Sequence, residues 1–186
     1  MPELAEVEFY RKRWHQAAVG ERVVEVLTHD TKKLLRELDL PAFRRALTGR
    51  RLESSATAAK QMLFRFGGGV WLGIHLGMSG ELTVGTPGHS PGKHDHLVIK
   101  TGHHALVFND PRMFGRVEFH VGKTPPRWWS RIAPAVLSDP FTVGAVAAFL
   151  QRRRRAPIKA VLLMQERFPG IGNWMADEIL WRAALH

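Results

Sequence analysis

The chain has 186 residues, of which 45% are hydrophobic and 24% are charged, and this composition excludes a disordered chain. No cysteine is present, so disulfides, a thiol nucleophile and a cysteine-ligated zinc site are excluded within these residues. The net charge of +10 favours a nucleic acid or another polyanion as partner, although a basic surface can also serve solubility alone. No apolar run reaches the ~18 residues of a membrane helix, and the first residues are acidic where an export signal is basic, so we expect an intracellular protein.

The first part of the chain predicts one helix followed by strands. Residues 1–20 have helical spacing, because Leu4, Val7 and Trp14 share one face and Gly20 is a suitable stop. Short apolar segments separated by glycine-containing turns then predict antiparallel strands. These segments are residues 22–27, 61–66, 70–76, 95–100, 105–108 and 115–120. Such a series of short strands indicates an antiparallel sandwich or barrel.

The pattern changes near residues 123–126, where Pro125 and Pro126 mark a linker. Helical segments are expected after it, at residues 141–154, 157–167 and 174–185. We therefore expect two domains, a β-rich domain at residues 1–124 and a helical domain at residues 125–186.

The segment between the last two predicted helices carries the strongest local binding signal. Gly170 and Gly172 flank one apolar residue and predict a tight turn, after which the first N–H groups of the next helix suit a phosphate. Asn173 adds a side-chain donor. The same glycines would also serve a plain helical hairpin, and the local sequence leaves both interpretations open.

Five motifs, taken in order, resemble those of the formamidopyrimidine-DNA glycosylases. They are PELAEVE at residues 2–8, HLGMSG at 75–80, KHDH at 93–96, DPRMFG at 110–115 and GIGN at 170–173. The resemblance covers essentially the whole chain. It implies an α+β fold, with an N-terminal antiparallel β-sandwich that carries an N-terminal helix, followed by a helical domain with a helix-two-turn-helix element.

The resemblance also implies a function. The family consists of bifunctional DNA glycosylases and abasic-site lyases, which excise oxidised purines, chiefly 8-oxoguanine and formamidopyrimidines, from double-stranded DNA. We accordingly expect residues 1–124 to be catalytic, residues 125–186 to bind DNA, and the protein to act as a monomer at the bacterial nucleoid in the cytoplasm. No cofactor, bound metal or membrane is expected.

The catalytic residues implied by the resemblance lie at the N-terminus. Pro2, once Met1 is removed, matches the family's nucleophile, and a secondary amine is suited to attack the sugar C1′ and form an iminium. Glu3 matches the general acid for opening the sugar ring, and its helical angle places it on the apolar side. Glu6 matches a second acid that orients a water or the sugar. Taken alone, all three residues could simply start a helix and complement its dipole.

The implied DNA contacts come from residues throughout the chain. Lys60 matches the lysine that reaches the active-site phosphates, and it is grouped with the catalytic residues. The DNA-binding set is His75, Met78, Arg112, Phe114, Lys159 and Asn173. Met78, Arg112 and Phe114 match the residues that fill the gap left by an extruded base. Without the motifs, Lys60 would be a solvated lysine, and Met78 and Phe114 would be ordinary core residues. Arg152 to Arg155, before Lys159, fit a phosphate track or a solvated face equally well.

Three departures from the family pattern are visible. Ala5 stands where proline is usual, and Met113 stands where a basic residue is common. The family's four-cysteine zinc ribbon has no counterpart in these 186 residues. We therefore keep a second hypothesis, a non-catalytic or lyase-only relative that binds damaged or nicked DNA. A basic RNA-binding protein is a third, but it does not explain residues 2–8.

Overall fold

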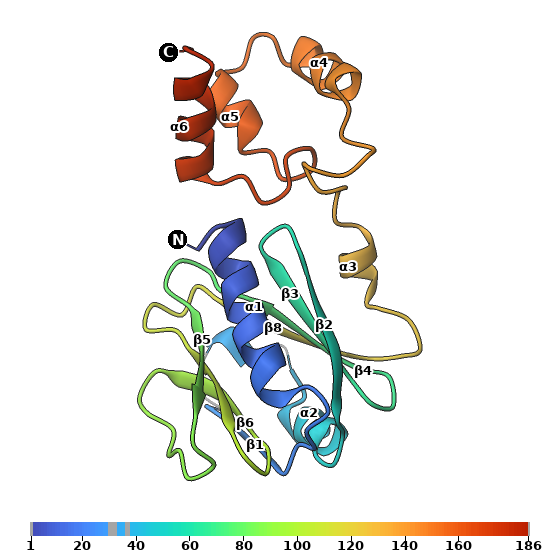
Figure 1. Ribbon diagram of the computed structural model, residues 1–186, viewed down its shortest axis with the longest axis vertical. Helices are drawn as coiled ribbons and strands as arrows, with labels where there is room; N and C mark the ends of the chain where they lie inside the picture. The colour runs from blue at the N-terminus through green and yellow to red at the C-terminus, as the bar shows by residue number, and fades with distance from the viewer. Residues whose placement is uncertain (1, 30–32, 36–37, 186) are drawn as a thin grey trace. The chain divides into compact units, whose positions relative to one another are not determined.

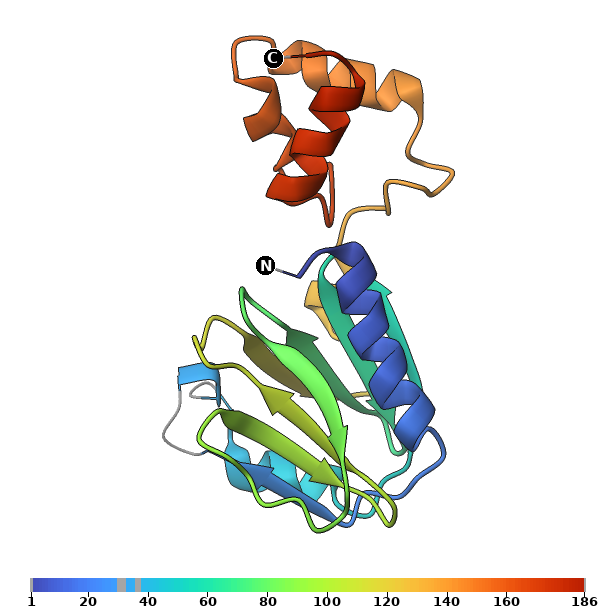
Figure 2. The same ribbon diagram turned by 60° about the vertical axis from the view of Figure 1, so that its left-hand side comes forward.

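The computed structural model describes residues 2–29, 33–35 and 38–185 (Figures 1 and 2). The chain forms two compact units. The larger unit holds the residues up to Pro126 except Ala58–Lys60, and the smaller unit holds Ala58–Lys60 and the residues from Arg127 onward. No helix in the described part of the chain is both long and apolar enough to cross a membrane.

The larger unit is an antiparallel β-sandwich with an N-terminal helix, α1 (Leu4–Ala18). Its strands are β1 (Glu25–Thr28), β2 (Leu52–Ala58), β3 (Gln61–Phe66), β4 (Val70–His75), β5 (Glu81–Gly85), β6 (Asp95–Lys100), β7 (Ala105–Asn109) and β8 (Arg116–Val121). Within the described residues, they form two four-stranded sheets, in the orders β1-β6-β7-β5 and β2-β3-β4-β8. A 3₁₀ turn, η1 (Lys33–Leu35), and helix α2 (Leu40–Leu47) lie between β1 and β2 in the chain.

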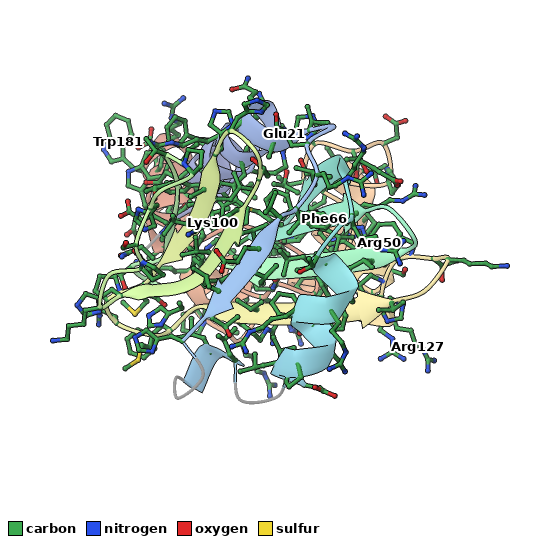
Figure 3. All side chains as sticks on the ribbon, turned by 90° about the horizontal axis from the view of Figure 1, so that it is seen from below. Glu21, Arg50, Phe66, Lys100, Arg127 and Trp181 are labelled. Carbon is green, nitrogen blue, oxygen red and sulfur yellow. The ribbon has the colours of Figure 1, made fainter. Side chains whose placement is uncertain are left out.

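Apolar side chains between the sheets form the core of this unit. Figure 3 shows side chains filling the space, with the buried Phe66 among them. Helix α1 packs against β5 and β3. Trp14 anchors it, because its ring lies 5.3 Å from the Phe64 ring and its Nε1–H donates to the Thr83 carbonyl at 2.9 Å. These contacts fix the helix against both sheets, and so they fix the position of its first residues.

The smaller unit contains α3 (Arg127–Ser130), α4 (Val143–Arg152), α5 (Ile158–Leu162) and α6 (Asn173–Arg182). Its core includes Phe149, Phe168 and Ala176, all buried. Gln165 closes the double turn between α5 and α6. Its Nε2 donates to the Leu163 and Ile171 carbonyls, and its Oε1 accepts from the Gly170 N–H.

The predicted α+β fold, a sandwich followed by helices, is confirmed. The sequence analysis missed β2, β5, α2, α3 and η1. The helix expected at residues 157–167 is α5, which ends at Leu162, because Gln165 draws the following backbone into turns instead.

Candidate functional site

The N-terminal residues of the predicted catalytic set lie at the start of α1. Pro2 is half-buried and immediately precedes Glu3, the N-cap residue of the helix. Glu3 is 8% exposed. Its backbone is extended, so Glu3 is the N-cap residue just before the helix, whereas its helical angle predicted a place on the apolar face of the helix. The sequence puts the nitrogen of Pro2 in the peptide bond to Met1, and removal of Met1 would make it a secondary amine.

Glu6 holds this N-terminal segment in place. Its carboxylate Oε2 accepts a hydrogen bond from the backbone N–H of Glu3 at 2.6 Å, as part of a capping box. A carboxylate in the first turn also suits the positive end of the helix dipole. Glu6 therefore orients the backbone that carries Pro2 and Glu3.

Lys60 and His75 lie at neighbouring strand ends. Lys60 follows Ala59, which has a left-handed φ of 53°, in the turn between β2 and β3. The next residue, Gln61, pairs with His75 at the end of β4. The Nδ1 of His75 accepts the Gly77 N–H at 3.1 Å, so a neutral His75 ring carries its proton on Nε2, where it can donate to a phosphate oxygen.

Two loops bring Met78, Arg112 and Phe114 together. The loops are in backbone contact, because a Cβ added to Gly77 would lie 2.3 Å from the carbonyl carbon of Phe114. Met78 is 43% exposed and Phe114 is 56% exposed. The Arg112 guanidinium lies 5.1 Å from the centre of the Phe114 ring. The exposure of Met78 and Phe114 excludes the interpretation of both as ordinary core residues, and we call the three residues the wedge patch.

Asp110 and Ser79 complete this region, and the sequence analysis gave neither a role. Asp110 is fully buried. Its Oδ1 accepts the Ser79 hydroxyl at 2.6 Å, and its Oδ2 accepts the Gly115 N–H at 2.7 Å. The available signal was an aspartate at the start of a turn, a position where its carboxylate commonly accepts nearby backbone N–H groups.

A pocket of about 410 Å³ lies beside the wedge patch in the larger unit. Gln61, His75 and Arg116 form one row across β3, β4 and β8 and line it, together with Phe114. In the described part of the chain, no three histidine, aspartate or glutamate side chains gather as a metal site.

The remaining predicted residues, Asn173 and Lys159, lie in the smaller unit. Asn173 is exposed and is the first residue of α6, after Gly172 at the N-cap. The Nζ of Lys159 forms an ion pair with Asp177 at 2.6 Å. Lys159 would therefore have to exchange this carboxylate for a phosphate in order to contact DNA.

The run of arginines before Lys159 is divided in its roles. The Arg153 guanidinium lies 3.6 Å from the centre of the Phe149 ring and also pairs with Glu166 at 3.6 Å. Arg152, Arg154 and Arg155 are exposed. Arg153 is thus a packing residue. Arg154 and Arg155 present their charge to solvent, and the exposed Arg152 guanidinium also lies 5.9 Å from the centre of the Phe149 ring.

Comparisons with known proteins identify the family. The model of the formamidopyrimidine-DNA glycosylase N-terminal domain matches residues 1–117, and that of the formamidopyrimidine-DNA glycosylase H2TH domain matches residues 132–186. The chain belongs to the formamidopyrimidine-DNA glycosylase family. The resemblance drawn from the five sequence motifs is thereby confirmed.

Individual relatives show how far the similarity extends. The chain is 38% identical to the formamidopyrimidine-DNA glycosylase of Roseiflexus sp. (strain RS-1) and 37% identical to that of Chloroflexus aurantiacus. Both matches cover the whole chain but 68% and 66% of the relatives, so the chain spans about two thirds of their length.

Solved structures agree with these relatives. The Lactococcus lactis formamidopyrimidine-DNA glycosylase, bound non-covalently to DNA with an abasic site, superposes with a TM-score of 0.87 at 28% identity. That match covers 100% of this chain and 71% of the solved one. The structure of MutM with DNA containing carbocyclic 8-oxo-G gives a TM-score of 0.86, also at 28% identity, and covers 100% of this chain and 69% of that one.

Proposed function

We propose that this chain is a bifunctional DNA glycosylase and abasic-site lyase that excises oxidised purines, 8-oxoguanine and formamidopyrimidines, from double-stranded DNA. The observation that carries the proposal is that Pro2 immediately precedes the buried Glu3 at the start of α1. Glu6 holds the backbone of this segment in place through its hydrogen bond with the Glu3 N–H. Family membership and the DNA complexes of the solved relatives support the substrate class.

The first step is base excision by Pro2. After Met1 is removed, the Pro2 nitrogen attacks C1′ of the damaged nucleotide, and the bond from C1′ to the base breaks with its electron pair leaving on the base. The nitrogen then loses its proton. The C1′–O4′ bond opens, O4′ takes a proton from the Glu3 carboxyl, and an iminium joins C1′ to Pro2.

The second step is strand cleavage. The iminium acidifies C2′, which loses a proton as the C3′–O bond breaks and the 3′ phosphate leaves. Water then hydrolyses the iminium and regenerates the Pro2 amine. Lys60 would bind the phosphates that flank the damaged sugar through its positive charge, and His75 would donate a hydrogen bond to them from its ring N–H.

The wedge patch has a separate task in this scheme. Extrusion of a base leaves a gap in the stack, and Met78 and Phe114 are apolar and exposed enough to enter it. Arg112 would donate to the edge of the orphaned cytosine. Asn173 and the first turn of α6 would bind a backbone phosphate.

Borohydride trapping tests the nucleophile directly. The protein with a processed N-terminus should form a covalent adduct with a duplex that contains an abasic site, and peptide mapping should place the DNA on Pro2. The same chain with an N-terminal extension, in which the Pro2 nitrogen stays in a peptide bond, should form none. An adduct mapped to a lysine would overturn the assignment.

The alternative is a non-catalytic or lyase-only relative that binds damaged or nicked DNA. It is favoured by the Lys159–Asp177 ion pair, because a lysine that pairs with a carboxylate is less able to bind a phosphate. Under this alternative, we expect duplex binding near the non-specific range of ~10⁻⁴–10⁻⁶ M at physiological salt. Abasic DNA should be preferred to an intact lesion duplex, because less extrusion is needed.

Matched duplexes separate the two functions. Trapping on abasic DNA together with 8-oxoguanine excision supports the bifunctional enzyme, and trapping alone supports the lyase. Binding without either reaction supports the non-catalytic relative. Nanomolar, lesion-selective binding with efficient excision would contradict the alternative.

A further inference from the structure

We propose that Asp110 is a positioning residue for base extrusion, which joins the two wedge loops into one rigid unit. The inference rests on the proposed function, because it concerns how the wedge patch is presented to DNA. The first wedge loop, residues 77–80, carries Met78, and the second, residues 110–115, carries Arg112 and Phe114.

Hydrogen bonds from both loops converge on the Asp110 carboxylate. Ser79 of the first loop donates its hydroxyl to Oδ1. From the second loop, the Arg112 N–H reaches the same oxygen at 3.3 Å, and the Gly115 N–H reaches Oδ2. The Ser79 hydroxyl oxygen lies 3.3 Å from the Arg112 N–H as well, so one carboxylate and one hydroxyl bridge the two loops.

The backbone of Asp110 is itself anchored to the start of strand β6 and to the residue just before it. Its N–H donates to the His94 carbonyl at 3.0 Å, and its carbonyl accepts a hydrogen bond from His96 Nε2 at 2.8 Å. His96 is completely buried. The carboxylate is therefore held by the sandwich core, and the loops are held by the carboxylate.

The two loops are closely packed around the carboxylate. A Cβ on Gly115 would lie 3.0 Å from Asp110 Oδ2 and 2.6 Å from the Phe108 ring. Gly77, with φ of +63°, meets the Phe114 backbone in the same way. Met113, between Arg112 and Phe114, has a left-handed φ of 56°. Such a conformation at a residue other than glycine persists only where its surroundings enforce it.

A rigid wedge matters because the residues of the wedge patch are largely exposed and act by insertion. A loose loop would lose conformational entropy on entering the stack, and the rigid loop has already lost it. Asp110 touches neither the base nor the sugar in this scheme. Its effect on extrusion must therefore pass through Phe114, Arg112 and Met78.

The variant Asp110→Asn isolates this role. Donors face both carboxylate oxygens, so the NH₂ group of an asparagine meets a donor whichever way the amide turns. We expect excision of 8-oxoguanine paired with cytosine to fall by about ten- to a hundredfold, since misplacement of a positioned group by about 1 Å has effects of this size. Trapping on abasic DNA, which needs less extrusion, should change by less than about threefold.

A double-mutant cycle shows whether Asp110 acts through the wedge. If it does, Asp110→Asn added to Phe114→Ala should reduce excision much less than Asp110→Asn does alone. Multiplicative effects of the two changes would overturn the proposal, as would equal losses on paired-lesion and abasic DNA.

Two further variants keep the test decisive. Thr101→Val is the matched control, because Thr101 is a buried hydroxyl that organises the turn at the opposite end of β6 and β7. It should leave the ratio of excision to trapping unchanged. Ser79→Ala, which removes only the bridging hydroxyl, should lower that ratio in the direction of Asp110→Asn, and it decides the question if Asp110→Asn does not fold.

A fluorescent readout separates this proposal from the proposed function. A 2-aminopurine placed next to the lesion brightens when the stack opens, with or without turnover. If wild-type protein brightens the probe but neither excises nor traps, the proposed enzyme is wrong and Asp110 is still tested by the loss of brightening in Asp110→Asn. If Asp110→Asn brightens the probe as wild type does, the proposal fails, whatever the enzyme activity.

Discussion

Substitutions of Glu6 distinguish a structural role at the start of α1 from a chemical one. The Glu6 carboxylate accepts the Glu3 N–H at 2.6 Å, in the position that a capping box gives to either glutamate or glutamine. Glu6→Gln keeps an oxygen acceptor there, whereas Glu6→Ala removes it. If Glu6 acts by orienting the backbone of Pro2 and Glu3, glutamine should largely preserve activity and alanine should not.

The size of the stability effect follows from helix capping. Loss of a cap residue costs about 0.5–2 kcal/mol. For a chain of this length, 1 kcal/mol lowers Tm by about 2–4 °C, so Glu6→Ala should unfold about 1–8 °C earlier than wild type. Glu6→Gln loses only the interaction of its charge with the helix dipole, worth about 0.3–1 kcal/mol. Calorimetry of the three proteins measures these shifts.

Single-turnover trapping on abasic DNA supplies the functional half of the comparison. Glu6→Gln should trap within about fivefold of wild type, since its cap persists, and Glu6→Ala should fall by about ten- to a hundredfold, as misplaced reacting groups do. If Glu6→Gln traps as poorly as Glu6→Ala while its Tm matches wild type, Glu6 acts through its proton or charge. The capping explanation would then be refuted, and the expectation that Glu6 orients a water or the sugar would be favoured.

Three other changes probe the acid Glu3, the helical unit, and the Glu8 carboxylate of α1, which accepts the Thr57 hydroxyl of β2 at 2.9 Å. Glu3→Gln should bind DNA like wild type but lose excision by about 10²–10⁴-fold, and a loss below about threefold would remove Glu3 from the mechanism. Asp177→Asn should free Lys159 to bind phosphate, so duplex binding should tighten and the slope of log K against log salt should steepen by about 0.9; an unchanged slope would show that Lys159 does not face DNA. Hydrogen bonding to Arg11 lowers the pKa of Glu8 in the folded protein. The ionised carboxylate therefore stabilises the fold at pH values above the pKa of the unfolded state, and this stabilisation is lost as the pH falls through the pKa of the folded state. Glu8→Gln should therefore lower Tm at pH 7 and make no difference near pH 2, and an equal loss at both pH values would contradict the linkage.

The parts of the fold that the sequence predicts are those with a strong local pattern. Helix α1 follows from apolar residues at helical spacing, and strands such as β3 and β4 follow from apolar runs on either side of a glycine turn. Strand β2 reads LESSATA, which is small and polar, and it lies at the edge of its sheet with much of its length exposed. Its strand conformation comes from pairing with the sheet, and the residues themselves carry little of that signal.

Helix α2 was predictable and was overlooked. Asp39 is its N-cap and accepts the Ala42 N–H, and Pro41 stands in the first turn, a combination that typically starts a helix. The early end of α5 was not predictable in this way. It depends on Gln165 reaching the Ile171 carbonyl and the Gly170 N–H, which are brought near only by the folded turn.

The candidate site shows the same difference between what the sequence predicts and what only the folded structure shows. The motifs predict which residues contact DNA, because Met78, Arg112 and Phe114 each match a family position. They do not predict what holds those residues, since the donors that converge on Asp110 come from residues 79, 112 and 115, and these meet only when the Gly77 backbone lies against that of Phe114. A buried acid with this arrangement leaves little local trace beyond its place in a turn. Contacts between residues that are distant in the sequence, such as the Asp110 bridge and the Lys159–Asp177 pair, are therefore visible only in the structure. Lys159 and Asp177 lie outside the five motifs, so their ion pair is also a place where this chain can differ in activity from relatives that share those motifs.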